Sequence, residues 1–91
     1  MAILIKTNGD RSDVFPKKKI FSLEEMYNLL ECSCVQVIHL QNEQTMWIDE
    51  EGKLKPHQIN IEATKLLIRA GGCPGDYIAG SALITDSREI N

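Results

Sequence analysis

Two cysteines and two histidines are the first side chains in this sequence whose types suggest chemistry. Cys32 and Cys34 lack the paired short motifs of a four-ligand zinc site, and redox pairs are separated by two residues rather than one. His39 stands in an apolar stretch without an adjacent nucleophile and orienting group, and His57 follows a proline. We therefore expect no metal, cofactor or catalytic residue here. We expect at least one cysteine to be buried beside a turn, and His39 to be a core or partly exposed residue.

Three consecutive acidic residues, Asp49, Glu50 and Glu51, form a second candidate, for a hard cation. An EF-hand loop places oxygen ligands at alternating positions over about twelve residues, and this segment does not supply them. A charged hairpin tip explains the acidic residues better. In this interpretation Gly52 takes a left-handed conformation, and residues 53–55 form a short return strand.

A glycine-rich segment at residues 71–76 superficially matches a phosphate-binding loop. Phosphate loops precede a helix and use its positive N-terminus, whereas this segment follows a predicted helix and lacks the Lys-Ser/Thr ending. A helix end and a turn account for it. Glycine amides can still meet an anion, so we retain Asp76, with amides near Gly75 and Gly80, as candidate binding groups.

Trp47 and Tyr77 are the aromatic residues with the clearest potential for a role beyond packing. A single tryptophan in a small domain usually lies in the core. An exposed one would serve as a stacking platform or an interface anchor. We favour the core for Trp47, and keep both residues as candidates for contact with a ligand or partner.

The elements that must position these residues follow the order β-β-α-β-β-α-β. Hydrophobic patterns place the main strands at residues 3–6, 14–15, 35–40, 45–48 and 77–84, with 35–40 buried. Asn8-Gly9 predicts a type I′ hairpin turn, which needs positive φ at both central residues. The fold class is therefore α+β, with a mostly antiparallel sheet covered by two helices.

Both helices have clear start signals. Ser22 and Glu25 predict a capping box at the first helix, and a hydrophobic staple joins Phe21 to Met26. The expected buried stripe consists of Leu23, Met26, Leu29 and Leu30. Asn60 is the expected N-cap of the second helix. Its apolar face is formed by Ala63, Leu66, Leu67 and Ala70, and Gly71-Gly72 ends it.

Length and composition limit the function. Ninety-one residues predict a single domain at 1–91, with 86–91 as a frayed tail. A net charge of −3 argues against general nucleic-acid binding. Without a membrane-length apolar run or a signal peptide, and with three cysteines, the cytoplasm is the expected compartment.

Several segments together resemble a small family of uncharacterised domains of bacteriophages and mobile elements. The matching stretches are Phe21–Met26, Met46–Leu54 (with the motif Trp-Ile-Asp-Glu-Glu-Gly-Lys-Leu), Asn60-x-x-Ala63-Thr64 and Gly75-Asp76-x-Ile78-x-Gly80-x-Ala82. The resemblance carries over no catalytic residues. It implies a host bacterial cytoplasm and an accessory, counter-defence role.

The leading hypothesis is a non-catalytic binding protein, expected to be a homo-oligomer. In one mode oligomers sequester a nucleotide-type signal in a pocket at the subunit interface, using Lys65, Arg69 or residues 17–19 with the amides near Gly75 and Gly80. In the other it inhibits a host defence protein, using Trp47 and residues 49–53. The alternatives are a small hydrolase of a nucleotide ligand, using His39 or Asp76, and a structural or regulatory phage protein.

Overall fold

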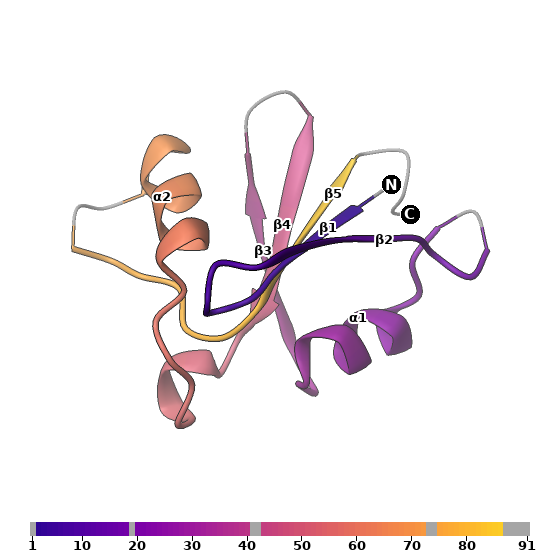
Figure 1. Ribbon diagram of the computed structural model, residues 1–91, viewed down its shortest axis with the longest axis horizontal. Helices are drawn as coiled ribbons and strands as arrows, with labels where there is room; N and C mark the ends of the chain where they lie inside the picture. The colour runs from indigo at the N-terminus through magenta and orange to yellow at the C-terminus, as the bar shows by residue number, and fades with distance from the viewer. Residues whose placement is uncertain (1, 19, 41–42, 73–74, 87–91) are drawn as a thin grey trace.

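The computed structural model describes residues 2–18, 20–40, 43–72 and 75–86, which form a five-stranded antiparallel sheet between two α-helices (Figure 1). The strands are β1 (Ala2–Ile5), β2 (Arg11–Val14), β3 (Val35–His39), β4 (Gln44–Asp49) and β5 (Ala82–Asp86), and the helices are α1 (Leu23–Leu30) and α2 (Ile61–Arg69). The predicted fold class and the order β-β-α-β-β-α-β are confirmed.

The strand order in the sheet is β2-β1-β5-β4-β3. β5 therefore lies in the centre, paired with β1 on one side and β4 on the other. Its register places Ile84 opposite both Ile3 and Met46. Because side chains alternate along a strand, these three residues share one face of the sheet.

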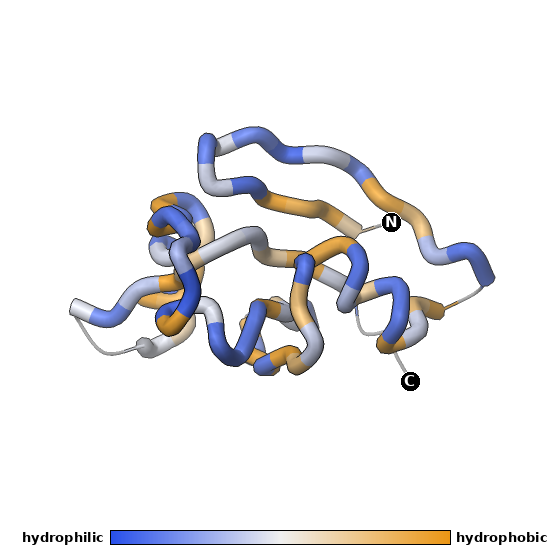
Figure 2. The backbone as a smooth tube through the Cα atoms, turned by 90° about the horizontal axis from the view of Figure 1, so that it is seen from below, coloured by the Kyte–Doolittle hydropathy of each residue, from blue (hydrophilic) through white to orange (hydrophobic). Residues whose placement is uncertain are grey.

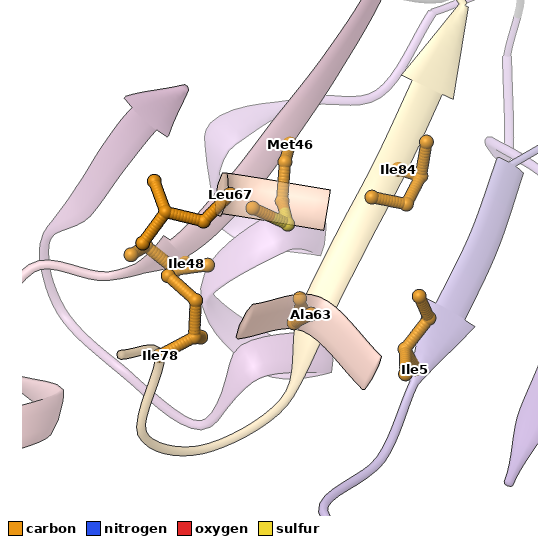
Figure 3. Close-up of a cluster of buried hydrophobic side chains, with 8 residues drawn as sticks. Ile5, Met46, Ile48, Ala63, Leu67, Ile78 and Ile84 are labelled. Carbon is orange, nitrogen blue, oxygen red and sulfur yellow. The ribbon is translucent and has the colours of Figure 1, made fainter. Parts of the chain in front are cut away.

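Each face of the sheet packs against one helix. Ile5, Met46, Ile48 and Ile84 meet Ala63 and Leu67 of α2 on one face, where Ile78 closes the cluster (Figure 3). On the other face, Leu4 and Leu83 meet Met26 and Leu30 of α1, together with Phe21. The neighbouring residues Leu83 and Ile84 thus serve different helices. In Figure 2, β1 is coloured as hydrophobic and the turn that joins it to β2 as hydrophilic.

The capping box of α1 is confirmed. The Ser22 hydroxyl accepts a hydrogen bond from the Glu25 N–H, and the Glu25 carboxylate accepts one from the Ser22 N–H, both at 3.1 Å. Phe21 and Met26 are buried in the same cluster, as expected for a staple. The prediction was wrong for Leu23, the first residue of α1, which is 54% exposed, while Met26 and Leu30 are the buried residues of the helix.

Asn60 caps α2, as predicted, and its side chain is fully buried. Its Oδ1 accepts a hydrogen bond from the Ala63 N–H, and its Nδ2 donates to the carbonyls of Ile5 and Gly80 at 3.0 and 2.9 Å. One amide group therefore joins α2 to β1 and to the segment before β5. Gly71, with φ of 98°, ends the helix as expected.

Two turn predictions were wrong. At the β1–β2 turn the Gly9 N–H donates to the Lys6 carbonyl, and only Gly9 has a positive φ. The turn is therefore a three-residue loop with glycine at its left-handed position, instead of the two-residue type I′ turn. Residues 52–54 form a 3-10 helix in place of the hairpin bulge and the return strand. A Cβ on Gly52 would lie 2.5 Å from the Ala79 carbonyl oxygen, so glycine is required there for close packing.

Two strand predictions also need correction. Residues 35–40 were expected to be buried, but β3 is an edge strand with Val37 40% exposed. The last strand begins at Ala82 instead of Tyr77, because Ala79 makes only an isolated bridge with Ile59. Asp86, which was expected to begin the tail, is the final residue of β5 and pairs with Gln44. Residues 87–91 lie outside the described part of the chain.

The Asn60 side chain should be among the strongest single contributions to stability. We expect Asn60→Ala to lower the free energy of unfolding by about 2–4 kcal/mol, because it removes a cap and the side-chain donor to two buried carbonyls. Urea denaturation measures this loss. The matched control is Ser22→Ala, which removes the exposed cap of α1 and should cost about 1 kcal/mol. Equal effects of the two substitutions would contradict the role assigned to Asn60.

Candidate functional site

A polar cluster lies at the end of β4, where Asp49 meets two basic side chains. The Asp49 side chain is 1% exposed, and its Oδ2 accepts a hydrogen bond from Lys55 Nζ at 2.8 Å. Nε2 of His57 lies 3.3 Å from the same oxygen, and Oδ1 accepts from the Glu51 N–H. The carboxylate thus holds the connection between β4 and α2 against the end of the sheet. We call Asp49, Lys55 and His57 the Asp49 cluster.

The environment of Asp49 favours its ionised form. Burial alone raises the pKa of a carboxyl group, but the hydrogen bonds from Lys55, the Glu51 N–H and His57 outweigh it, so the pKa of Asp49 is lowered. The same ion pair raises the pKa of Lys55. A general base needs a free lone pair and access to substrate. The Asp49 side chain is 1% exposed and is bonded to three neighbours, so it lacks this access, and its arrangement is that of a structural carboxylate.

A second ion pair lies nearby on the surface. Lys53 of the 3-10 helix pairs with Asp76, and its ammonium lies 4.7 Å from the centre of the Tyr77 ring. The hydrogen bond from Lys53, with another from the Tyr77 N–H, lowers the pKa of Asp76. The structure therefore brings the predicted residues Asp76 and Tyr77 together, with Lys53 as their shared partner. Asp76 is engaged as an anion, which makes it a poor general acid.

Gly80 does not offer an amide to an anion. Its N–H donates to the Gln58 carbonyl, and its own carbonyl accepts from Asn60. The backbone at position 80 has a φ of +90°, a conformation that favours glycine, and an added Cβ would lie 3.2 Å from the His57 ring. The His57 ring therefore lies close to the backbone of Gly80, and the proposed role of Gly80 in anion binding is not supported by this geometry. Gly75 is exposed, and Cys73 lies outside the described residues.

Trp47 is half-buried and packs with the α1 side of the core. Its indole N–H donates to the hydroxyl of the fully buried Thr85 at 3.0 Å. A tryptophan anchored in this way contributes to packing, which agrees with the favoured interpretation. It is not an exposed platform for stacking.

The side chains that were candidates for catalysis do not lie together in one site. His39 is exposed at the edge of the sheet and pairs with Thr45 near the start of β4, whereas Asp76 binds Lys53 beyond the end of β4. Cys32 is half-buried. Burial is the main cause that raises the pKa of its thiol, and the nearby negative charge of Asp49 raises this pKa further. A raised thiol pKa disfavours the thiolate nucleophile. Among the described residues, no three His, Cys, Asp or Glu side chains are grouped to hold a metal ion.

The remaining predicted residues, Lys65 and Arg69, border a groove on the outer face of α2. The groove has a volume of about 380 Å³ and is lined by Ile59, Ile61, Thr64, Lys65, Ile68 and Arg69. Ile61 is 63% exposed, and Ile59 and Ile68 are also exposed. We call this surface the α2 groove. It combines exposed apolar side chains with two cations.

The isoleucines of the α2 groove were not predicted, because the buried stripe of Ala63, Leu66, Leu67 and Ala70 already accounts for an amphipathic helix. Ile61 and Ile68 are seven residues apart, so they lie on one face, opposite Ala63 and Leu67. A second apolar stripe on a helix that already has a buried one is a detectable signal. Lys55 was also missed, since the loop that brings it back to Asp49 has no sequence signature.

The fold and surface define a small α+β domain with a grooved outer helix and no assembled reaction centre in the described residues. The chain matches a family model, Domain of unknown function (DUF3846), over residues 1–90, and it belongs to that family. Comparisons with curated proteins and with solved structures found no match. In the part of the chain that the structure describes, neither helix is long and apolar enough to span a membrane.

The lowered pKa of Asp49 predicts how stability depends on pH. A carboxyl group whose folded-state pKa lies below its unfolded value of about 3.9 stabilises the fold above that value, and loses this effect as pH falls through the lowered pKa. We therefore expect Asp49→Asn to reduce stability at neutral pH and to flatten the loss of stability below about pH 4. Urea denaturation over a series of pH values tests this.

Glu50→Gln is the matched control, because it neutralises an exposed neighbouring carboxylate. It should leave both the stability at neutral pH and its acid dependence close to those of the unsubstituted protein. If Asp49→Asn behaved like Glu50→Gln, the Asp49 cluster would have no structural role.

Proposed function

We propose that this protein is a non-catalytic binding protein that sequesters a small nucleotide-type ligand in the α2 groove. The observation that carries the proposal is the pairing of exposed isoleucines with Lys65 and Arg69 on a chain whose net charge is −3. The apolar side chains of the groove can pack against the base of a nucleotide, and the two cations can bind its phosphates. The volume of about 380 Å³ falls within the range of small-molecule sites, about 300–1,000 Å³.

The charges favour the α2 groove over the other cation-bearing surface. Lys17 and Lys18 also line a hollow, but Glu24 and Glu25 share it. The Glu25 carboxylate already accepts hydrogen bonds from the backbone N–H groups of Lys17 and Ser22. A phosphate there would meet two carboxylates, whereas the lining of the α2 groove contains Lys65 and Arg69 and no acidic residue. The Lys65 ammonium lies 3.3 Å from the Glu62 carboxylate, but this ion pair is exposed, and exposed pairs contribute little, so a phosphate can compete for the lysine.

Inhibition of a host protein remains the second candidate mode. The surface first assigned to it, Trp47 with residues 49–53, is weakened as a docking site because Trp47 and Asp49 are committed to internal contacts. The exposed apolar patch of the α2 groove suits a protein partner in its place. In either mode we propose a bacteriophage or mobile-element protein that acts against a host defence system in the bacterial cytoplasm, as the resemblance of the motifs implies.

A thermal-shift screen with cyclic dinucleotides, ADP-ribose and common nucleotides tests the proposal. A ligand that binds only the folded state stabilises it by about 2.7 kcal/mol at a concentration of 100 Kd, which gives a measurable rise in Tm. Substitution of Lys65 or Arg69 by alanine should weaken binding about tenfold or more, since hydrogen bonds to charged groups contribute about 1.5–3 kcal/mol. The absence of any shift across the panel would contradict nucleotide sequestration.

Lys18→Ala is the matched control for charge, because it removes an exposed cation away from α2. It should leave the affinity unchanged. Chromatography of the ligand released by denaturing the protein separates binding from hydrolysis: intact ligand is expected, and accumulated product would establish an enzyme. Co-purification of a bacterial protein, lost on Ile61→Asp and without any nucleotide effect, would favour the second mode.

A further inference from the structure

The outer edge of β3 presents a row of backbone groups without partners in the described structure. In the β3–β4 ladder the Leu40 N–H donates to the Gln44 carbonyl, and the Glu50 N–H donates to the Cys34 carbonyl. Hydrogen-bonded pairs alternate along an antiparallel ladder, so the even-numbered residues of β3 face β4. The N–H and C=O groups of Val35, Val37 and His39 therefore point away from the sheet, and residues 2–18, 20–40, 43–72 and 75–86 provide no hydrogen bond to them.

The opposite edge of the sheet is protected by charge. On β2 the Lys6 N–H donates to the Asp10 carbonyl, so the outward-facing residues by the same alternation are Arg11 and Asp13. Both carry charges, and charged side chains on an edge strand discourage pairing with another chain. The outward-facing residues of β3 include no Lys, Arg, Asp or Glu, and Val37 is 40% exposed. Only the β3 edge is therefore suited to accept a strand.

The outward-facing residues of β3 are self-complementary. They are spaced evenly about Val37, so an antiparallel second copy would place Val37 opposite its counterpart and Val35 opposite His39. Each of these three pairs would be a hydrogen-bonded pair, which gives about six backbone hydrogen bonds in total. No like charges would face each other across the junction, despite the net charge of −3.

We propose that two copies of this chain associate along β3, with Val37 at the two-fold axis, and join their sheets into one continuous sheet. The axis lies perpendicular to the sheet, so the α1 face of one copy continues into the α1 face of the other. Val37 is opposite Trp47 in the β3–β4 register, so the second copy covers both the exposed valine and part of the half-buried indole. This pairing identifies the surface for the homo-oligomer expected from the sequence, and it stands independently of ligand binding at α2.

Molar mass measured by light scattering over a wide range of protein concentration tests the pairing. The full chain should form a dimer that dissociates on dilution. Val37→Lys should shift the protein to the monomer, because two lysines would face each other at the axis. Ser12→Lys places the same charge on the protected β2 edge and should leave the dimer intact. A monomeric full chain at all concentrations would overturn the proposal, as would a dimer that Val37→Lys leaves unchanged.

Hydrogen exchange provides a readout that does not depend on a variant. The amides of Val35, Val37 and His39 should become protected as the concentration of the unsubstituted chain rises, while those of Arg11 and Asp13 exchange rapidly throughout. If Val37→Lys failed to fold, the concentration dependence of exchange at these amides would by itself test the pairing along β3. Rapid exchange at the three β3 amides in a dimeric sample would place the interface elsewhere and refute the pairing.

Discussion

The carboxamide of Asn60 is the interaction on which the arrangement of α2 depends. It is buried, and it bonds simultaneously to the first turn of α2, to β1 and to the segment before β5. The backbone N–H of the same residue donates to the Ile78 carbonyl at 2.7 Å. Because α2 has only nine residues, its own backbone bonds would not hold it in place. The orientation of the α2 groove follows from this anchor and from the packing of Ala63 and Leu67.

Local signals were sufficient to predict the helices and the order of the elements. The capping box at Ser22 and the N-cap at Asn60 involve residues three positions apart, so the sequence contains both partners. Features that depend on distant partners were not predictable in the same way. At the 3-10 helix Gly52–Leu54, Gly52 packs against the carbonyl of Ala79, which lies 27 residues further along the chain. β3 is exposed because β5, instead of β3, occupies the centre of the sheet.

The candidate site was predicted in part, and its errors have a common cause. Lys65 and Arg69 border the α2 groove as expected for a contact surface, but Asp49, Trp47 and Gly80 are occupied by internal bonds. A sequence shows the chemical type of a side chain and not the partners that already saturate it. Asp49 is the clearest example, because its partner Lys55 returns through a loop with irregular backbone. Groups that are satisfied inside the fold contribute to its shape. Lys65 and Arg69 are exposed on α2, and Lys65 makes only a surface ion pair with Glu62.

The central position of β5 has a consequence for how the protein folds while it is synthesised on the ribosome. β5 follows the other four described strands in sequence, yet it lies between β1 and β4, so neither β1 nor β4 has its inner neighbour until β5 has been synthesised. The pairing of Ile3 with Ile84 joins residues from nearly opposite ends of the chain, and such long-range contacts slow folding. The β1–β2 and β3–β4 hairpins can form early, but Met46 and Ile48 lack the neighbouring strand β5 until residues 82–86 have been synthesised. Completion of the sheet therefore waits for β5, and until then the inner edges of β1 and β4 are unpaired strand edges, which are the groups that favour aggregation of partly folded chains.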